Sequence, residues 1–114
     1  MDESLGMTII NMQKLKMIEE MESCNEISVR YGLELSPAQI EGIVKRRFEA
    51  LKDNGRLELG GGIIKLLIYE FCDSPYISQD NYEEMLIELQ DSFYYFKNMS
   101  LDMLSDEELI KYMK

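Results

Sequence analysis

The side chains of this chain that could do chemistry are carboxylates, lysines, arginines and tyrosines, because the sequence contains no histidine. Without histidine, catalysis by a Ser-His-Asp or Cys-His arrangement and every zinc site that uses histidine are excluded. The two cysteines, Cys24 and Cys72, cannot by themselves build a four-cysteine zinc site. We therefore predict no catalytic residue, no metal site and no cofactor, and we interpret the protein as a non-enzyme.

Acidic residues are abundant, but their spacing does not indicate an active site. Glu84, Glu88 and Asp91 share one face of a predicted helix. Because no second carboxylate group can be identified to complete a metal site, we interpret them as a solvated face. An enzyme that uses carboxylates and a divalent ion is the weakest of our functional alternatives.

A basic cluster is the first candidate contact with a partner. Lys45, Arg46 and Arg47, with Lys52 and Arg56 nearby, are the only concentration of positive charge in the chain. Such a cluster could bind phosphates or an acidic partner. The alternative is an intramolecular role, in which Arg47 pairs with an acid of the C-terminal half or the cluster complements a helix dipole.

An adjacent tyrosine pair is the second candidate contact. Tyr94 and Tyr95 lie on either side of the helix face that Phe93 and Phe96 define. Exposed tyrosines are typical of protein interfaces. Partial burial against neighbouring helices is the alternative.

A glycine run, Gly60, Gly61 and Gly62, precedes a predicted helix. Its backbone N–H groups could bind an anion, although the lysine and hydroxyl residue that follow in a phosphate loop are missing. The alternative is a turn that permits close packing of the backbone.

The sequence predicts that the elements which position these side chains are helices. A first helix is predicted over residues 8–22. The Ser23-x-x-Glu26 capping box predicts a second, short helix that ends at a left-handed Gly32. The alternation of apolar residues over 27–33 leaves a short strand as the alternative.

The clearest helix start in the sequence is Ser36-Pro37-Ala38-Gln39. Serine is a preferred N-cap, proline suits the first turn, and glutamine completes a capping box. We predict a helix over 37–53 that Gly55 closes.

Three further helices follow. Residues 62–72 are apolar on nearly every side, which is typical of a buried helix. Residues 79–98 carry an apolar stripe and form the longest predicted helix, and Ser105 caps a last one. The predicted fold is all-α: a compact single-domain bundle over 1–114, with about five or six helices around a buried central helix at 62–72 that packs against 37–53 and 79–98.

The net charge of −10 disfavours nucleic acid and anionic membranes as partners. Residues 66–114 contain eleven acids and three bases, so the C-terminal half holds most of the excess negative charge. No secretory signal and no apolar run of about 20 residues is present. We therefore expect a cytoplasmic protein with free thiols, whose partner is another protein or a second copy of itself.

Three segments of the chain, residues 55–63, 71–82 and 89–98, resemble a family of small bacterial helical proteins known only as a domain of unknown function. The resemblance implies a bacterial, cytoplasmic origin. It carries no activity, ligand or catalytic residue to this chain.

The function we predict is that of a non-catalytic accessory or adaptor protein that acts by protein–protein binding. The charge of −10 motivates one alternative, an acidic mimic of nucleic acid or a regulator of a nucleic-acid-binding protein. Direct nucleic-acid binding through Lys45, Arg46 and Arg47 is disfavoured by the same charge.

Overall fold

The computed structural model describes residues 3–56, 62–99 and 103–114, and its description of side chains begins at Met12. The described chain contains five α-helices, two single-turn 3-10 helices and no strand, which confirms the predicted all-α fold. In chain order the elements are α1 (Glu3–Ser28), η1 (Val29–Tyr31), α2 (Pro37–Asp53), α3 (Ile64–Phe71), η2 (Gln79–Asn81), α4 (Tyr82–Asn98) and α5 (Asp106–Met113).

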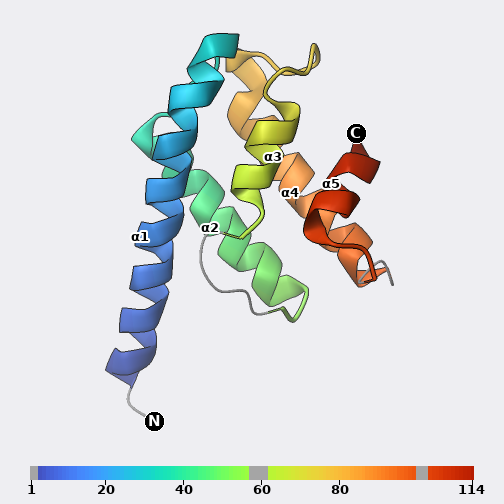
Figure 1. Ribbon diagram of the computed structural model, residues 1–114. Helices are drawn as coiled ribbons and strands as arrows, with labels where there is room; N and C mark the ends of the chain where they lie inside the picture. Colours follow the sequence, from blue (N-terminus) through green and yellow to red (C-terminus); the bar gives the residue numbers. More distant parts are fainter. Residues whose placement is uncertain (1–2, 57–61, 100–102) are drawn as a thin grey trace.

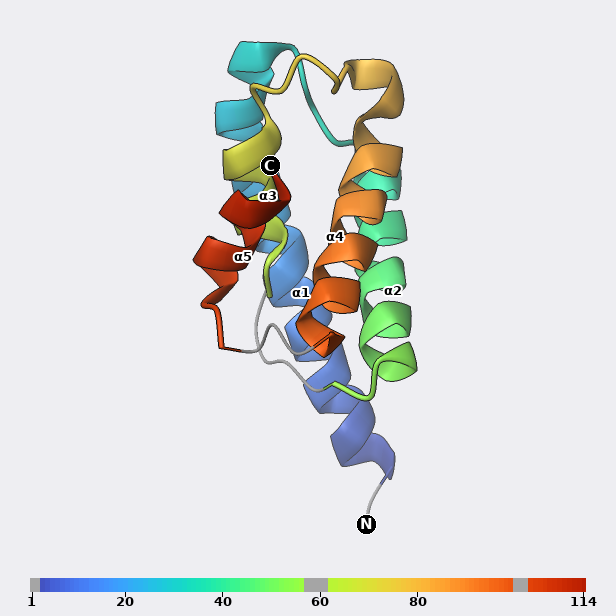
Figure 2. The ribbon, with the colours of Figure 1, turned by 90° about the vertical axis from the view of Figure 1, so that its right-hand side faces the viewer.

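Successive helices run in alternating directions and form a bundle (Figures 1 and 2). The neighbours α1–α2, α2–α4, α4–α3 and α3–α1 close a four-helix ring, and α5 packs on α3 and α4. In this ring α2 lies diagonally opposite α3. The first turns of α1 extend past the ends of the other helices in both views.

The core follows helical periodicity on each element. Among the side chains of α1 from Met12 onward, the buried ones are Met17, Met21, Cys24 and Ser28, which recur every three or four positions. Leu67 and Ile68 of α3 and Leu86 and Phe93 of α4 are also fully buried. The bundle therefore encloses one continuous apolar core.

The predicted boundary at Ser23 is wrong. The hydroxyl of Ser23 donates to the backbone oxygen of Glu19 at 3.0 Å, so Ser23 lies inside a helix and does not cap a new one. The resulting α1 has 26 residues and is the longest described helix. The prediction that residues 79–98 form the longest helix is therefore also wrong. Gly32, with φ +78°, does end the helical segment as predicted, and no described residue of 27–33 forms a strand.

The predicted start of α2 is confirmed. The Ser36 hydroxyl accepts a hydrogen bond from the Gln39 backbone N–H at 3.2 Å, and the Gln39 side chain accepts one from Ser36 N–H at 2.9 Å. Ser105 likewise caps α5 by accepting from Glu108 N–H.

Helix α3 differs from the prediction in two respects. It spans Ile64–Phe71, and Lys65 and Tyr69 are exposed, so it is not apolar on every side. Helix α3 packs against α1, α4 and α5 and not directly against α2, so the predicted packing against residues 37–53 is limited to Gly62, whose backbone approaches Arg47. The reason is that α2 lies diagonally opposite α3 in the ring, whereas α1 and α4 are adjacent to both.

Candidate functional site

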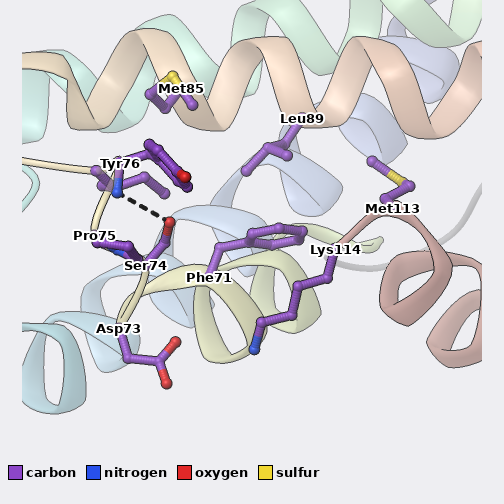
Figure 3. Close-up of a pocket in the computed structure, with 10 residues that line it drawn as sticks. Phe71, Asp73, Ser74, Pro75, Tyr76, Met85, Leu89, Met113 and Lys114 are labelled. Carbon is purple, nitrogen blue, oxygen red and sulfur yellow. Dashed lines mark hydrogen bonds between the residues drawn. The ribbon is translucent and has the colours of Figure 1, made fainter.

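An apolar groove of about 540 Å³ opens where the segment after α3 meets α4 and the end of α5 (Figure 3). We call it the Tyr76 groove. Its lining residues are Phe71, Asp73, Ser74, Pro75, Tyr76, Ile77, Met85, Leu89, Met113 and Lys114. A volume of this size lies in the range of sites that hold a drug-sized ligand or the anchoring side chains of a partner.

Hydrogen bonds hold the first wall of the groove, residues 73–77, in one conformation. The backbone N–H of Ser74 donates to Phe71 O at 2.9 Å, and the N–H of Tyr76 donates to the Ser74 hydroxyl at 3.2 Å (Figure 3). The side-chain amide of Asn81 donates to Tyr76 O at 3.1 Å. Pro75 fixes a further backbone torsion. This wall is therefore formed before any partner binds.

The opposite wall belongs to α4 and the closing end to α5. Met85 and Leu89 are four residues apart, so their side chains lie one turn from each other on the same face of α4. Met113 lies at the far end, and Phe71 forms the floor between them (Figure 3). The side chain of Tyr76 is 81% exposed, although its surroundings are apolar.

Charged groups stand only at the rims of the groove. Asp73 is exposed at one side, and Lys114 at another forms an ion pair with Glu70 at 3.6 Å. Glu88 is not part of the lining, but it follows Met85 by three residues on α4 and is exposed. Within the described ranges, Asp73 and Glu88 have no ion-pair partner, and no three acidic or cysteine side chains are grouped to hold a metal ion. The chemistry of the groove is therefore burial of apolar surface beside acidic rims.

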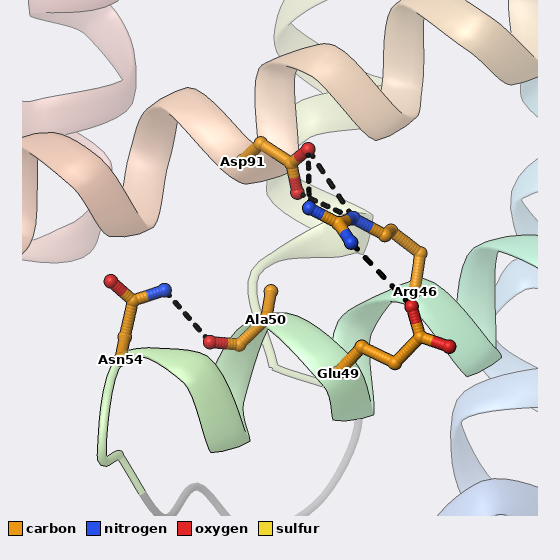
Figure 4. A network of polar contacts seen from close by, with 5 residues as sticks. All are labelled: Arg46, Glu49, Ala50, Asn54 and Asp91. Carbon is orange, nitrogen blue, oxygen red and sulfur yellow. Dashed lines mark hydrogen bonds and ion pairs between the residues drawn. The ribbon is translucent and has the colours of Figure 1, made fainter.

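The basic cluster is largely engaged inside the molecule. Arg46 binds the carboxylate of Asp91 on α4 with Nε and Nη2, both 3.1 Å from the nearest oxygen, and contacts Glu49 at 3.5 Å (Figure 4). Hydrogen bonding to Asp91 raises the pKa of Arg46. An acid of the C-terminal half, Asp91, is thus paired with Arg46. Lys45 is exposed on α2.

Arg47 is fully buried, which makes it unsuitable as a partner contact. Its Nη1 lies 3.6 Å from the sulfur of Met17, and its guanidinium lies 5.7 Å from the centre of the Phe48 ring. A Cβ at Gly62 would stand 2.7 Å from Nε and from Nη2 of Arg47. The backbone of Gly62 therefore lies against a buried cation, and its φ of +66° also favours glycine, so both observations favour the close-packing interpretation. Gly60 and Gly61 lie outside the described residues.

The two adjacent tyrosines have different environments. Tyr94 is fully buried and meets the Phe93 ring edge-on, with centroids 5.3 Å apart, so its prediction as a surface contact is wrong. Tyr95 is 59% exposed and lines a shallow pocket of about 250 Å³ between α2 and α4 together with Arg46. Of the predicted contacts, Arg46 and Tyr95 line this pocket together.

The Tyr76 groove was not predicted from the sequence. Asp73, Pro75, Tyr76 and Met113 were missed because they are separated in sequence from Met85 and Leu89, so no local pattern connects them. One signal was available in the sequence: Tyr76 is a large aromatic residue directly after the turn residues Asp73, Ser74 and Pro75, and loops often carry functional residues.

None of the described helices combines the length and apolar character needed to cross a membrane. The comparison with curated proteins found no match, and neither did the comparison with solved structures. The family of unknown function DUF6323 matches residues 20–114, which contain the whole Tyr76 groove. The chain therefore belongs to this family.

Proposed function

We propose that this protein is a non-catalytic accessory protein that binds another protein through the Tyr76 groove. The observation that carries the proposal is an open groove of about 540 Å³ whose apolar lining comes from three separate segments of the bundle. Exposed apolar surface of this kind is a feature of interaction sites, since a monomer gains nothing by leaving it open.

The side chains of the groove suit a protein partner. Tyrosine and methionine are enriched at protein interfaces. Methionine side chains such as Met85 and Met113 adjust their shape to the aliphatic or aromatic groups that enter. The ordered 73–77 wall reduces the entropy that binding would cost.

The alternative of an acidic nucleic-acid mimic has less support. Such a mimic needs an array of unpaired acids. Several acids of the C-terminal half are instead paired with bases: Asp91 with Arg46, Asp106 with Lys97 at 3.0 Å, and Glu70 with Lys114. We therefore place the activity in the apolar groove.

We place the protein in the cytoplasm, where both thiols would stay free. Cys24 and Cys72 are buried and unpaired, and burial raises the pKa of each thiol, which keeps it protonated.

A pull-down with matched variants tests the proposal. Tagged wild type, Tyr76→Glu and Met103→Glu are compared in nuclease-treated lysate of the source organism. Met103 is 96% exposed, does not line the groove, and its substitution makes the same charge change. We expect one stoichiometric protein that wild type and Met103→Glu retain and Tyr76→Glu loses. Equal retention by all three would contradict the proposal.

A further inference from the structure

We infer that the segment bound by the Tyr76 groove is an amphipathic helix with lysine or arginine beside its apolar face. The inference rests on the proposed function and names the chemistry of the partner. It follows from the hydrogen-bonding groups that the groove provides and from the charges at its rims.

The first step concerns the backbone of the bound segment. An extended peptide carries unpaired N–H and C=O groups, and each one buried without a partner costs about 1–3 kcal/mol. The groove lining offers few polar groups, and the Ser74 hydroxyl already accepts from Tyr76 N–H. The described residues provide no strand edge to pair with either. A helix satisfies its own backbone, so it can enter an apolar groove at no such cost.

The second step concerns the apolar face. Met85 and Leu89 line one wall at helical spacing, and Ile77 and Met113 stand at other points of the lining. Several separated apolar positions suit side chains that recur every three or four residues on a docked helix. Two of these four residues, Met85 and Met113, are methionines, and methionine adapts to branched and aromatic groups alike. The groove therefore selects an apolar stripe and not one particular side chain.

The third step concerns charge. The chain carries a net charge of −10, and Asp73, the charged lining residue without an ion pair among the described residues, is acidic. Glu88, which is exposed on α4 three residues after Met85, adds a second acid near that wall. The basic rim residue, Lys114, is already paired with Glu70. Positive side chains that flank the apolar stripe of the partner would meet these acids, which raises the association rate and selects against acidic helices.

Peptide binding to the full chain tests the inference. The probe is a fluorescent amphipathic peptide of about 18 residues, built from leucine, alanine and lysine, which is long enough for several helical turns. Three matched peptides accompany it: one with glutamate in place of lysine, one with the same composition in scrambled order, and one with two central prolines. Fluorescence anisotropy gives the Kd for wild type, Tyr76→Glu, Met103→Glu and the charge-reversed Asp73→Lys/Glu88→Lys variant.

We expect the lysine peptide to bind wild type at least about tenfold more tightly than each of the other three peptides. The charge-reversed variant should reverse the preference between the lysine and glutamate peptides. Tyr76→Glu separates groove binding from general attraction to an acidic protein, because its extra negative charge would tighten a purely electrostatic complex. Binding through the groove instead predicts about a tenfold loss for Tyr76→Glu and none for Met103→Glu.

Other outcomes overturn the inference in distinguishable ways. If the glutamate or proline peptide binds best and Tyr76→Glu abolishes that binding, the groove still binds protein and only the basic helix is wrong. If no peptide binds and wild type sediments as a dimer that Tyr76→Glu dissociates, the occupant is a second copy of this chain. If no peptide binds and the protein is monomeric, both the inference and the groove assignment fail, provided that circular dichroism shows each variant folded.

Discussion

Replacing Gly62 by alanine should destabilise the bundle more than the same change at any other left-handed glycine of the described chain. Gly62 and Gly55 both have positive φ, +66° and +62°, so alanine at either position adopts a backbone conformation that costs about 1–2 kcal/mol. At Gly55 the added Cβ meets nothing within 4 Å. At Gly62 it stands 2.7–2.8 Å from three atoms of the Arg47 guanidinium.

The guanidinium has little room to move away, because Arg47 is fully buried between Met17 and Phe48. Forcing extra volume into a packed interior costs about 1–3 kcal/mol. Added to the backbone strain, this predicts a loss of about 2–5 kcal/mol for Gly62→Ala and about 1–2 kcal/mol for Gly55→Ala. The larger loss is a substantial part of the 5–15 kcal/mol that is typical of a domain.

Urea unfolding followed by far-ultraviolet circular dichroism measures both losses. A double-mutant cycle with Arg47→Met isolates the contact: we expect a coupling energy of about 1–3 kcal/mol between positions 47 and 62. Losses for Gly62→Ala and Gly55→Ala that agree within about 0.5 kcal/mol would refute the reasoning. They would show that the approach of Gly62 to Arg47 does not constrain this position.

Three further substitutions test other parts of the structure. Gln90 is fully buried and, among described residues, neither polar atom of its side chain has a hydrogen-bond partner. Gln90→Met should therefore raise the free energy of unfolding by about 1 kcal/mol. A decrease of similar size, measured by urea unfolding, would contradict this. Burial raises the pKa of Tyr82 to about 12, above the ordinary value of about 10 for a tyrosine in the unfolded chain. The contribution of the neutral Tyr82 to stability is therefore complete below about pH 10 and is lost as the pH rises from there to about 12. Unfolding at about pH 9 and about pH 11 should show this loss in wild type and a smaller one in Tyr82→Phe, and equal losses would count against it. Arg46→Met should lower the free energy of unfolding by no more than about 1 kcal/mol, because both side chains of the Arg46–Asp91 pair are over one-third exposed. This decrease should become smaller in high salt, which screens the ion pair. A decrease that does not depend on salt would mean that packing dominates.

Local sequence signals predicted the elements whose ends are set by their own residues. Ser36, Pro37 and Gln39 start α2 through contacts that lie within four residues of one another. Ser105 does the same for α5. The left-handed stop at Gly32 also depends on one residue, because glycine adopts positive φ without strain. These features need no knowledge of the rest of the chain.

Features that depend on distant residues could not be predicted. The Ser23-x-x-Glu26 pattern is a valid cap in isolation, but the core contacts of Met21 and Cys24 continue the helix through it. Tyr94 and Tyr95 are adjacent, and only the position of the neighbouring helices decides which one is buried.

The groove shows the same limit at the level of the candidate site. Its walls come from residues 71–77, 85–89 and 113–114, which meet only because α5 packs on α3 and α4. None of these segments predicts a groove by itself. The site therefore required the structure.

Site-specific photo-crosslinking tests the central claim, that the Tyr76 groove binds another protein. A photoreactive benzoylphenylalanine is placed at position 76 in one strain and at position 103 in another. Both positions are more than four-fifths exposed, but only Tyr76 lines the groove. We predict one discrete adduct from position 76 that contains a second protein, and no adduct of that mass from position 103. The same adducts from both positions, or none from position 76 in cells where the protein is folded, would contradict the account.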